Sequence, residues 1–317
     1  MATSNSIIST ASNPRAWDRS FNKIFYDNYA LVPNIMEMLV NQDTPMNGMT
    51  HYDKRGLDIP IGNAREMREG QPVQFDSWLD GPQKTVTPTK FGLGIQATIE
   101  AHKDDRFGHI REAQKQLAKS MNITSQMKQA DLFNSAFSTS RLGIDGKALC
   151  ATDHPLYGAS GSVVSNIVTG ALSKSTLLDA ILKGNKLVDE RGRPIQYTFK
   201  TLVIPPELEP IAKELLLSEY DPGTGNNAVN TLTNVNGGKG TNFTQKLSYI
   251  VNRYATSSTA WFLISDKSEH DLRHIVFDGV TPATFTDNNT DNIVYKVTSR
   301  WVDTFWLWRG VIGSTGL

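Results

Sequence analysis

The stretch that decides the fold is DDRFGHIREAQKQLAKSMNITSQMKQADLFNSAFS, residues 104–138. It contains no proline, and its one glycine, Gly108, lies near its start. Its apolar residues recur at steps of three, four and six positions, which keeps them on one face of a helix. These residues are Phe107, Ile110, Ala113, Leu117, Met121, Met127, Ala130, Phe133 and Phe137. The pattern predicts one helix, roughly 50 Å long at 1.5 Å per residue, that serves as a spine for other parts.

Two polar parts of this stretch affect the helix prediction. Asp104 and Asp105 lie in its expected first turn, where the helix dipole favours negative charge, so we interpret them as capping residues and not as metal ligands. The polar run NITS at 122–125 weakens the apolar stripe. A bend or break is therefore expected there.

Composition indicates a globular protein with room for two domains. The chain has 317 residues, of which 39% are hydrophobic and 20% are charged. Lys+Arg and Asp+Glu both total 32, so the formal net charge is zero. Because phosphate binding is driven by counterion release from a basic protein, zero net charge argues against a dedicated nucleic-acid binder.

The single cysteine, Cys150, excludes an intrachain disulfide framework and fits a reducing compartment. The first twelve residues lack a basic segment followed by an apolar one, so no signal peptide is predicted. No apolar run approaches the roughly 20 residues of a membrane span.

The segments before the spine differ in character. Residues 1–13 are a polar arm, and a helical pattern with many aromatics follows from Pro14 to about Val40, with Asn13 as its N-cap and Pro33 as a break or kink. Its aromatics are expected either in the chain's own core or on another subunit. Residues 41–90 predict a long two-stranded excursion with too few apolar residues for a core, and 90–101 predict a strand.

The segments after the spine alternate irregularly. A glycine-rich irregular stretch precedes a helix over 171–195, capped by Ser173 or Ser175, and a buried strand over 199–206. A short helix at 207–220 and a polar loop at 221–242 follow. Strands are expected at 246–254 and 260–266, and two or three more within 271–314. Helices and strands do not alternate regularly, so the fold class is α+β with antiparallel sheet.

Only one local group combines nucleophile, base and acid. Cys150, Asp153 and His154 could form a Cys–His hydrolase site, because a nearby histidine can activate a thiolate. The spacing matches no known motif, and Asp153-His154-Pro155 is more simply a turn before proline. The hydrolase is therefore a minor alternative.

Other chemical motifs are incomplete. His270 and His274 are four residues apart but lack the HExxH pattern of a zinc site. The sequence GGKGT at 237–241 lacks the spacing and the following helix of a phosphate-binding loop. The tryptophan-rich tail at 300–310 predicts a buried strand. No catalytic residue, cofactor site or metal site is predicted.

Several segments together resemble the major capsid proteins of tailed bacteriophages, including the Mu-like head-subunit group. The most specific is DGKALCATDHPL at 145–156, which is similar to a DGK…HPL segment of those proteins. Further similarities are the pattern Glu100-x-x-x-Asp104-Asp105-x-x-Gly108 and the segments LVIPPELE at 202–209, WFLISD at 261–266 and WRGVIGS at 308–314.

The resemblance implies the fold named after phage Hong Kong 97. Residues 1–48 would be the N-arm and 49–90 the E-loop, which lies across a neighbouring subunit. Residues 91–170 and 276–317 would form the peripheral domain with its spine helix, and 171–275 the axial domain. Lys54, Lys84 and Lys90 lie in the implied E-loop, but the sequence predicts no Lys–Asn cross-link. The chain has no room for the N-terminal scaffolding segment of some relatives.

The implied function is structural, without enzyme activity. The protein would self-assemble into pentamers and hexamers of an icosahedral head shell that encloses double-stranded DNA without sequence-specific binding. Its expected partners are scaffold, portal and decoration proteins, with no membrane. It would be assembled in the bacterial cytoplasm and located in the virion. An encapsulin-like protein cage is an alternative.

Overall fold

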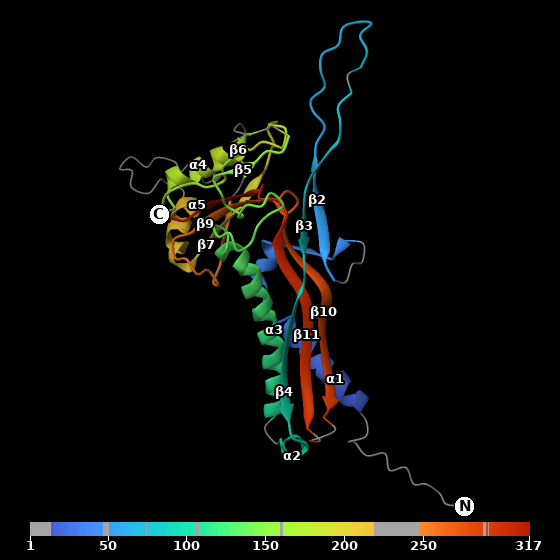
Figure 1. Ribbon diagram of the computed structural model, residues 1–317. Helices are drawn as coiled ribbons and strands as arrows, with labels where there is room; N and C mark the ends of the chain where they lie inside the picture. Colours follow the sequence, from blue (N-terminus) through green and yellow to red (C-terminus); the bar gives the residue numbers. More distant parts are fainter. Residues whose placement is uncertain are drawn as a thin grey trace, which may run out of the picture.

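We describe the protein from a computed structural model. The structure describes residues 14–46, 51–73, 75–105, 108–158, 161–218, 247–287, 290 and 292–317. These residues form two four-stranded sheets and a hairpin that extends well beyond both (Figure 1).

The first sheet runs along the length of the body, in the order β1-β10-β11-β4. Its strands are β1 (Asn41–Asp43), β10 (Leu272–Thr286), β11 (Ile293–Phe305) and β4 (Thr89–Ala97). β11 is antiparallel to both of its neighbours, whereas β1 is parallel to β10. Helices α1 (Pro14–Tyr29) and α3 (His109–Asn134) lie against this sheet and share a buried apolar core with β11.

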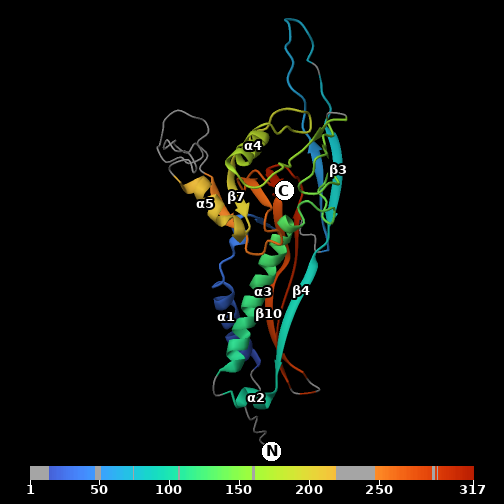
Figure 2. The same ribbon diagram turned by 90° about the vertical axis from the view of Figure 1, so that its left-hand side faces the viewer.

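The second sheet lies in the lobe beside the C-terminal end of α3 (Figure 2), in the order β12-β9-β7-β8. Its strands are β12 (Val311–Ser314), β9 (Trp261–Ser265), β7 (Phe199–Ile204) and β8 (Ser248–Val251). Alternate residues of β7 face different cores. Leu202 packs with α4 (Lys174–Asn185) and α5 (Glu209–Leu217), whereas Val203 packs with Phe133 of α3.

The hairpin consists of β2 (Asp53–Ile59) and β3 (Leu79–Val86), joined by a segment, 60–78, without regular secondary structure. Figure 1 shows this segment reaching far from the body. The root of the hairpin is anchored, because Leu57 and Val86 are buried against Ile144, Ile275 and Trp306. The predicted extended excursion is confirmed in outline, although 41–43 belong to the first sheet. The shorter elements are η2 (Ile35–Met38), α2 (Ile99–Lys103), β5 (His154–Pro155), β6 (Val163–Val164) and η4 (Pro206–Leu208).

The predicted spine is present but shorter than expected. α2 ends at Lys103, and α3 begins at His109 after Gly108, whose φ of 71° is in the left-handed region. Glycine adopts this conformation without steric cost, so the chain changes direction at Gly108, between α2 and α3. The side chain of Asp105 accepts hydrogen bonds from the N–H groups of His109 and Ile110, which makes it a cap of α3. Asp104 instead follows the last turn of α2.

The expected break at 122–125 is wrong. α3 is continuous there, and its polar side chains bind the turn that follows α1. Asn122 donates to the carbonyl oxygens of Tyr29 and Val32, at 2.9 and 3.3 Å, and Gln126 donates to that of Pro33 at 3.1 Å. These side chains satisfy backbone groups that the end of α1 would leave unpaired.

Three further expectations need comment. α1 ends at Tyr29, ahead of the predicted break at Pro33, and its Phe21 and Phe25 are fully buried in the chain's own core. Asn13 lies outside the described residues. The helix predicted over 171–195 ends at Asn185, and the chain then turns through Asp189–Gly192. The Ser173 cap is confirmed.

The segment Asp153-His154-Pro155 is not the expected turn. His154 and Pro155 form strand β5, which pairs with β6. The predicted polar loop at 221–242 and the GGKGT segment lie outside the described residues. The predicted division of the chain at residue 276 remains a prediction. β10 crosses it, and β12 joins the second sheet.

Candidate functional site

The cysteine of the hydrolase hypothesis is inaccessible. Cys150 is 2% exposed within an apolar core, and burial raises the pKa of its thiol far above the ordinary value. Among the described residues the structure gives no hydrogen bond between Cys150 and His154. Asp153 lies at the surface, ion-paired with Lys147. A thiolate nucleophile needs the opposite environment, so these three residues do not form a catalytic group.

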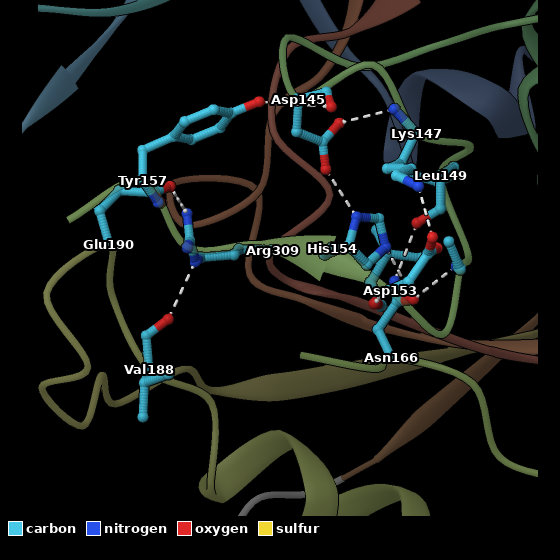
Figure 3. A network of polar contacts seen from close by, with 12 residues as sticks. Asp145, Lys147, Leu149, Asp153, His154, Tyr157, Asn166, Val188, Glu190 and Arg309 are labelled. Carbon is cyan, nitrogen blue, oxygen red and sulfur yellow. Dashed lines mark hydrogen bonds and ion pairs between the residues drawn. The ribbon is translucent and has the colours of Figure 1, made fainter. Parts of the chain in front are cut away.

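His154 instead lies at the centre of a buried polar network (Figure 3). Its Nδ1 lies 2.6 Å from Asp145 Oδ2, its Nε2 lies 3.1 Å from Asn166 Oδ1, and its ring stacks on Trp308 at a centroid distance of 4.1 Å. Asn166 donates through Nδ2 to the carbonyl oxygens of Leu149 and Val311. This donation makes Asn166 Oδ1 an acceptor for the ring. Both ring nitrogens therefore face oxygen atoms, so the ring is held at both ends by polar partners inside the protein.

The DGK…HPL segment thus has a structural role. Asp145 and His154 come from its two ends, and Asn166 connects them to the backbone of β12 through Val311. The segment between α3 and α4 has little regular structure, and only scattered backbone hydrogen bonds, such as Ile144 N–H to Trp306 and Cys150 N–H to Ala136, hold it. The buried network fixes it onto the second sheet.

A second buried ion pair lies in the same region. Arg309 Nη1 lies 2.7 Å from Glu190 Oε1, with both side chains 5% exposed. Arg309 Nε donates to the carbonyl oxygen of Val188, and Glu190 accepts from the N–H of Tyr157. These contacts hold the turn after α4 against the chain end, as Figure 3 shows.

The next residue of that turn holds the base of segment 60–78. Arg191 donates through Nε to the carbonyl oxygen of Pro60 at 3.1 Å and through Nη2 to that of Ser77 at 3.4 Å. Its Nη2 also lies 3.5 Å from the carboxylate of Asp76. Asp76 accepts hydrogen bonds from the N–H groups of Gly62 and Ser77, which lower the pKa of Asp76 below its ordinary value. Arg191 therefore contacts both legs of the segment, and we name this set of contacts the clasp.

Beyond the clasp the segment carries apolar side chains in contact with water. Phe75 is 96% exposed, Val73 62% and Trp78 59%. Soluble proteins seldom leave several large apolar groups together on one projecting segment unless they bind something. This segment is therefore the strongest candidate for a contact surface.

The remaining candidates are structural. His274 Nδ1 lies 2.6 Å from Asp303 Oδ1, and His270 accepts from the N–H of Leu272, so the two histidines have separate partners. No group of three metal-ligating side chains occurs in the part of the chain that the structure describes. The tryptophans of the tail, Trp301, Trp306 and Trp308, are buried as predicted, although only Trp301 lies in a strand.

Sequence reasoning missed Asn166, Glu190, Arg191 and Arg309. The partners described above lie between 12 and 131 residues away along the chain, so no local spacing indicates them. For Arg191, the run RGR after a helix signals only a turn.

The described helices include none that is long and apolar enough to cross a membrane.

Comparison with known proteins gives a consistent result. A family model described as phage capsid protein matches residues 82–313. A search of curated proteins found no match. Among solved structures, a chain of the procapsid of bacteriophage JBD30 is 16% identical, with 97% of this chain and 76% of that chain covered and a TM-score of 0.51.

Two further structures share the fold. A chain of the mature capsid of bacteriophage PhiM1 is 11% identical, with 90% of this chain and 87% of that chain covered and a TM-score of 0.53. A capsid chain of the native GTA particle is 8% identical, with 90% of each chain covered and a TM-score of 0.55. The α+β capsid fold is therefore confirmed.

Proposed function

This chain belongs to the phage capsid protein family, and on that premise we propose how it builds a head shell. It is a major capsid protein, and its copies join head to tail into pentamers and hexamers that close into an icosahedral shell around double-stranded DNA. Head-to-tail contacts between two different surfaces generate such rings. No enzymatic step is needed, and the buried thiol of Cys150 supports a structural role.

The observation that carries the proposal is the projecting segment 60–78. It presents Phe75, Val73 and Trp78 to water at a distance from the chain's own body (Figure 1). The clasp holds its base, so the segment projects in a defined direction. When the segment lies on a neighbouring copy, each Å² of apolar surface that it buries contributes roughly 25 cal/mol to the stability of the contact. The core of the subunit need not be larger for this gain.

The expected division of the chain fits this role. We propose 1–48 as N-arm, 49–90 as E-loop, 91–170 and 276–317 as peripheral domain, and 171–275 as axial domain. The first sheet with α1 and α3 supports the peripheral part, and the second sheet with α4 and α5 supports the axial part. Many such contacts, each weak, stabilise the whole shell because they act together.

The finer assignments follow from the family. We propose that the protein is located in the virion after assembly in the bacterial cytoplasm. Scaffold, portal and decoration proteins are its proposed partners. Zero net charge supports enclosure of DNA without specific binding. Nuclease-protected DNA in purified particles, in place of a protein cargo, would distinguish a phage head from an encapsulin-like cage.

Shortening the projecting segment tests the proposal. A deletion of the whole hairpin, 52–88, would remove Leu57 and Val86 from the core. Replacing 63–75 by a short Gly/Ser turn leaves the hairpin root in place. We expect the unfolding midpoint of the isolated subunit to be unchanged and the yield of closed shells, measured by sedimentation and electron microscopy, to be lost.

The control replaces Arg65 and Arg68 by glutamine within the full-length segment, which keeps its apolar residues and should preserve assembly. Shells of normal yield and stability from the shortened chain would contradict the proposed role of this segment.

A further inference from the structure

A groove of about 510 Å³ lies at the joint between the hairpin and the first sheet. It is separate from the projecting segment, and it adjoins the network of His154, because Asp145 acts on Lys84. Its walls come from the end of β3 and the start of β4, from α3 and the turn after it, and from β11. The charged side chains that line it are Lys84, Lys128, Arg141 and Asp303.

The positive groups outnumber the negative one in this groove. The carboxylate of Asp303 is already engaged by His274, at 2.6 Å. Lys84 and Arg141 are close enough that the guanidinium, together with the larger effect of burial, lowers the pKa of Lys84 to about 8. Asp145 also acts on Lys84, and Lys128 is ion-paired with Asp131 at 3.2 Å, whereas Arg141 makes no ion pair with a carboxylate in the described part of the chain. A guanidinium that lies near a second cation and lacks a carboxylate partner favours the binding of an anion.

The cations are also held in place. Lys84 Nζ donates to Thr304 Oγ1 at 2.7 Å and to the carbonyl oxygen of Phe305 at 2.8 Å, and it lies 5.0 Å from the centre of the Phe305 ring. Arg141 Nη1 donates to the carbonyl oxygen of Asp303 at 2.9 Å. A guanidinium has five N–H donors, so this bond leaves most of them for a ligand.

Neutral donors complete the lining. The hydroxyl groups of Thr87, Thr89 and Ser140 lie in the groove wall. The indole N–H of Trp301, in a side chain that is 2% exposed, has no hydrogen-bond partner in the described part of the chain. Fixed cations surrounded by hydroxyl donors form the kind of site that binds a tetrahedral oxyanion.

We propose that this groove binds one sulfate- or phosphate-type oxyanion between Arg141, Lys84 and Lys128. An anion bound there contacts the β3–β4 joint, the turn after α3 and β11 at once. It therefore stabilises the hairpin in its observed direction relative to the first sheet. The same chemistry can come from a free anion or from a phosphodiester of DNA.

Titration calorimetry of the full-length, unassembled chain tests the site with sodium sulfate, against sodium chloride at equal ionic strength to remove general screening. We expect saturable binding of sulfate alone. Arg141→Gln and Lys128→Gln should each weaken it about tenfold, since each removes a charge-assisted hydrogen bond. Lys119→Gln removes the same charge from α3 about 13 Å away along the helix and should bind normally.

Proton linkage gives a second measurement that needs no variant. Around Lys84 lie Arg141 and Asp145. Lys128 and Asp303 line the groove, and they are paired with Asp131 and His274. With a pKa of about 8, Lys84 is largely neutral at pH 8.5 and should take up a proton when the anion binds. Sulfate itself does not titrate there, so the measured heat should depend on the ionisation heat of the buffer.

A short DNA duplex identifies the source of the anion. Competition between the duplex and sulfate for the site would assign it to a phosphodiester, and sulfate binding that DNA does not affect would assign it to a free anion. The proposal is overturned if the wild-type chain shows no saturable sulfate binding, or if Arg141→Gln and Lys119→Gln bind sulfate equally.

Discussion

At the scale of single residues, His154 has the most demanding position. It is fully buried, it faces Asp145 and Asn166 through its two ring nitrogens, and it stacks on Trp308. Removing the ring leaves polar atoms of Asp145 and Asn166 buried without the partner that His154 provides. Without this network, the irregular segment at 145–156 is held less firmly against the second sheet.

We therefore predict that His154→Leu destabilises the subunit by about 1–3 kcal/mol in urea unfolding. Asp153→Asn, one residue away but at the surface, should leave the unfolding midpoint nearly unchanged. If His154→Leu lowers the unfolding free energy no more than Asp153→Asn does, the network contributes little to stability.

A second residue predicts a pH dependence. His270 is 2% exposed, and its burial lowers the pKa to about 4, below the ordinary value near 6.5. In the unfolded chain the ring binds a proton below pH 6.5, whereas the folded chain binds it only near pH 4. The stability that the neutral ring provides is complete above pH 6.5 and declines as the pH falls towards 4, by up to about 3 kcal/mol.

His270→Gln cannot titrate, and its amide oxygen is an acceptor like the ring nitrogen. We expect the difference in unfolding free energy between pH 7 and pH 4.5 to be smaller in this variant than in the wild type. An identical pH profile would assign the acid sensitivity to other groups.

At the scale of elements, the clasp sets the direction of segment 60–78. Arg191 holds the carbonyl oxygens of Pro60 and Ser77, and Asp76 holds the N–H of Gly62. Arg191→Ala removes the contacts with the body. We predict faster amide hydrogen exchange in peptides covering 60–79, slower shell assembly, and an unchanged core.

Arg193→Ala is the matched control, since Arg193 pairs with Asp189 in the same turn and makes no hydrogen bond or ion pair with the described residues of the segment. Equal exchange in the wild type and Arg191→Ala would mean that the segment is positioned by its strands alone.

The elements also show what local patterns can predict. The apolar steps in 110–133 predicted α3, because burial of one face decides that helix. The polar run at 122–125 is not the weak point that the pattern predicts. Asn122, and Gln126 just beyond the run, bind the carbonyl oxygens of Tyr29, Val32 and Pro33, about 90 residues earlier. The start of α3 at His109 depends on the left-handed backbone of Gly108, which the apolar pattern does not contain.

The candidate site shows the same limit. Cys150 and His154 are four residues apart in the sequence, yet the first packs in an apolar core and the second binds Asp145 and Asn166. The motif at 145–156 identified the family, but its structural role becomes evident only with Asn166 in place.

At the scale of the whole molecule, the chain has the parts of a shell subunit. Two sheets built around α3 form a rigid body, and the hairpin projects from it with apolar residues in water (Figures 1 and 2). A single chain leaves these apolar residues exposed to water, so their burial requires a neighbouring molecule. The central claim is that this neighbour is a second copy of the same chain.

Electron cryomicroscopy of particles purified from cells that express the chain tests this claim most directly. The account predicts closed icosahedral shells in which residues 60–78 of each subunit lie on the adjacent subunit of the same ring, with Phe75 and Trp78 buried. A chain that stays monomeric or dimeric under all conditions, or shells in which these residues remain in solvent, would contradict it.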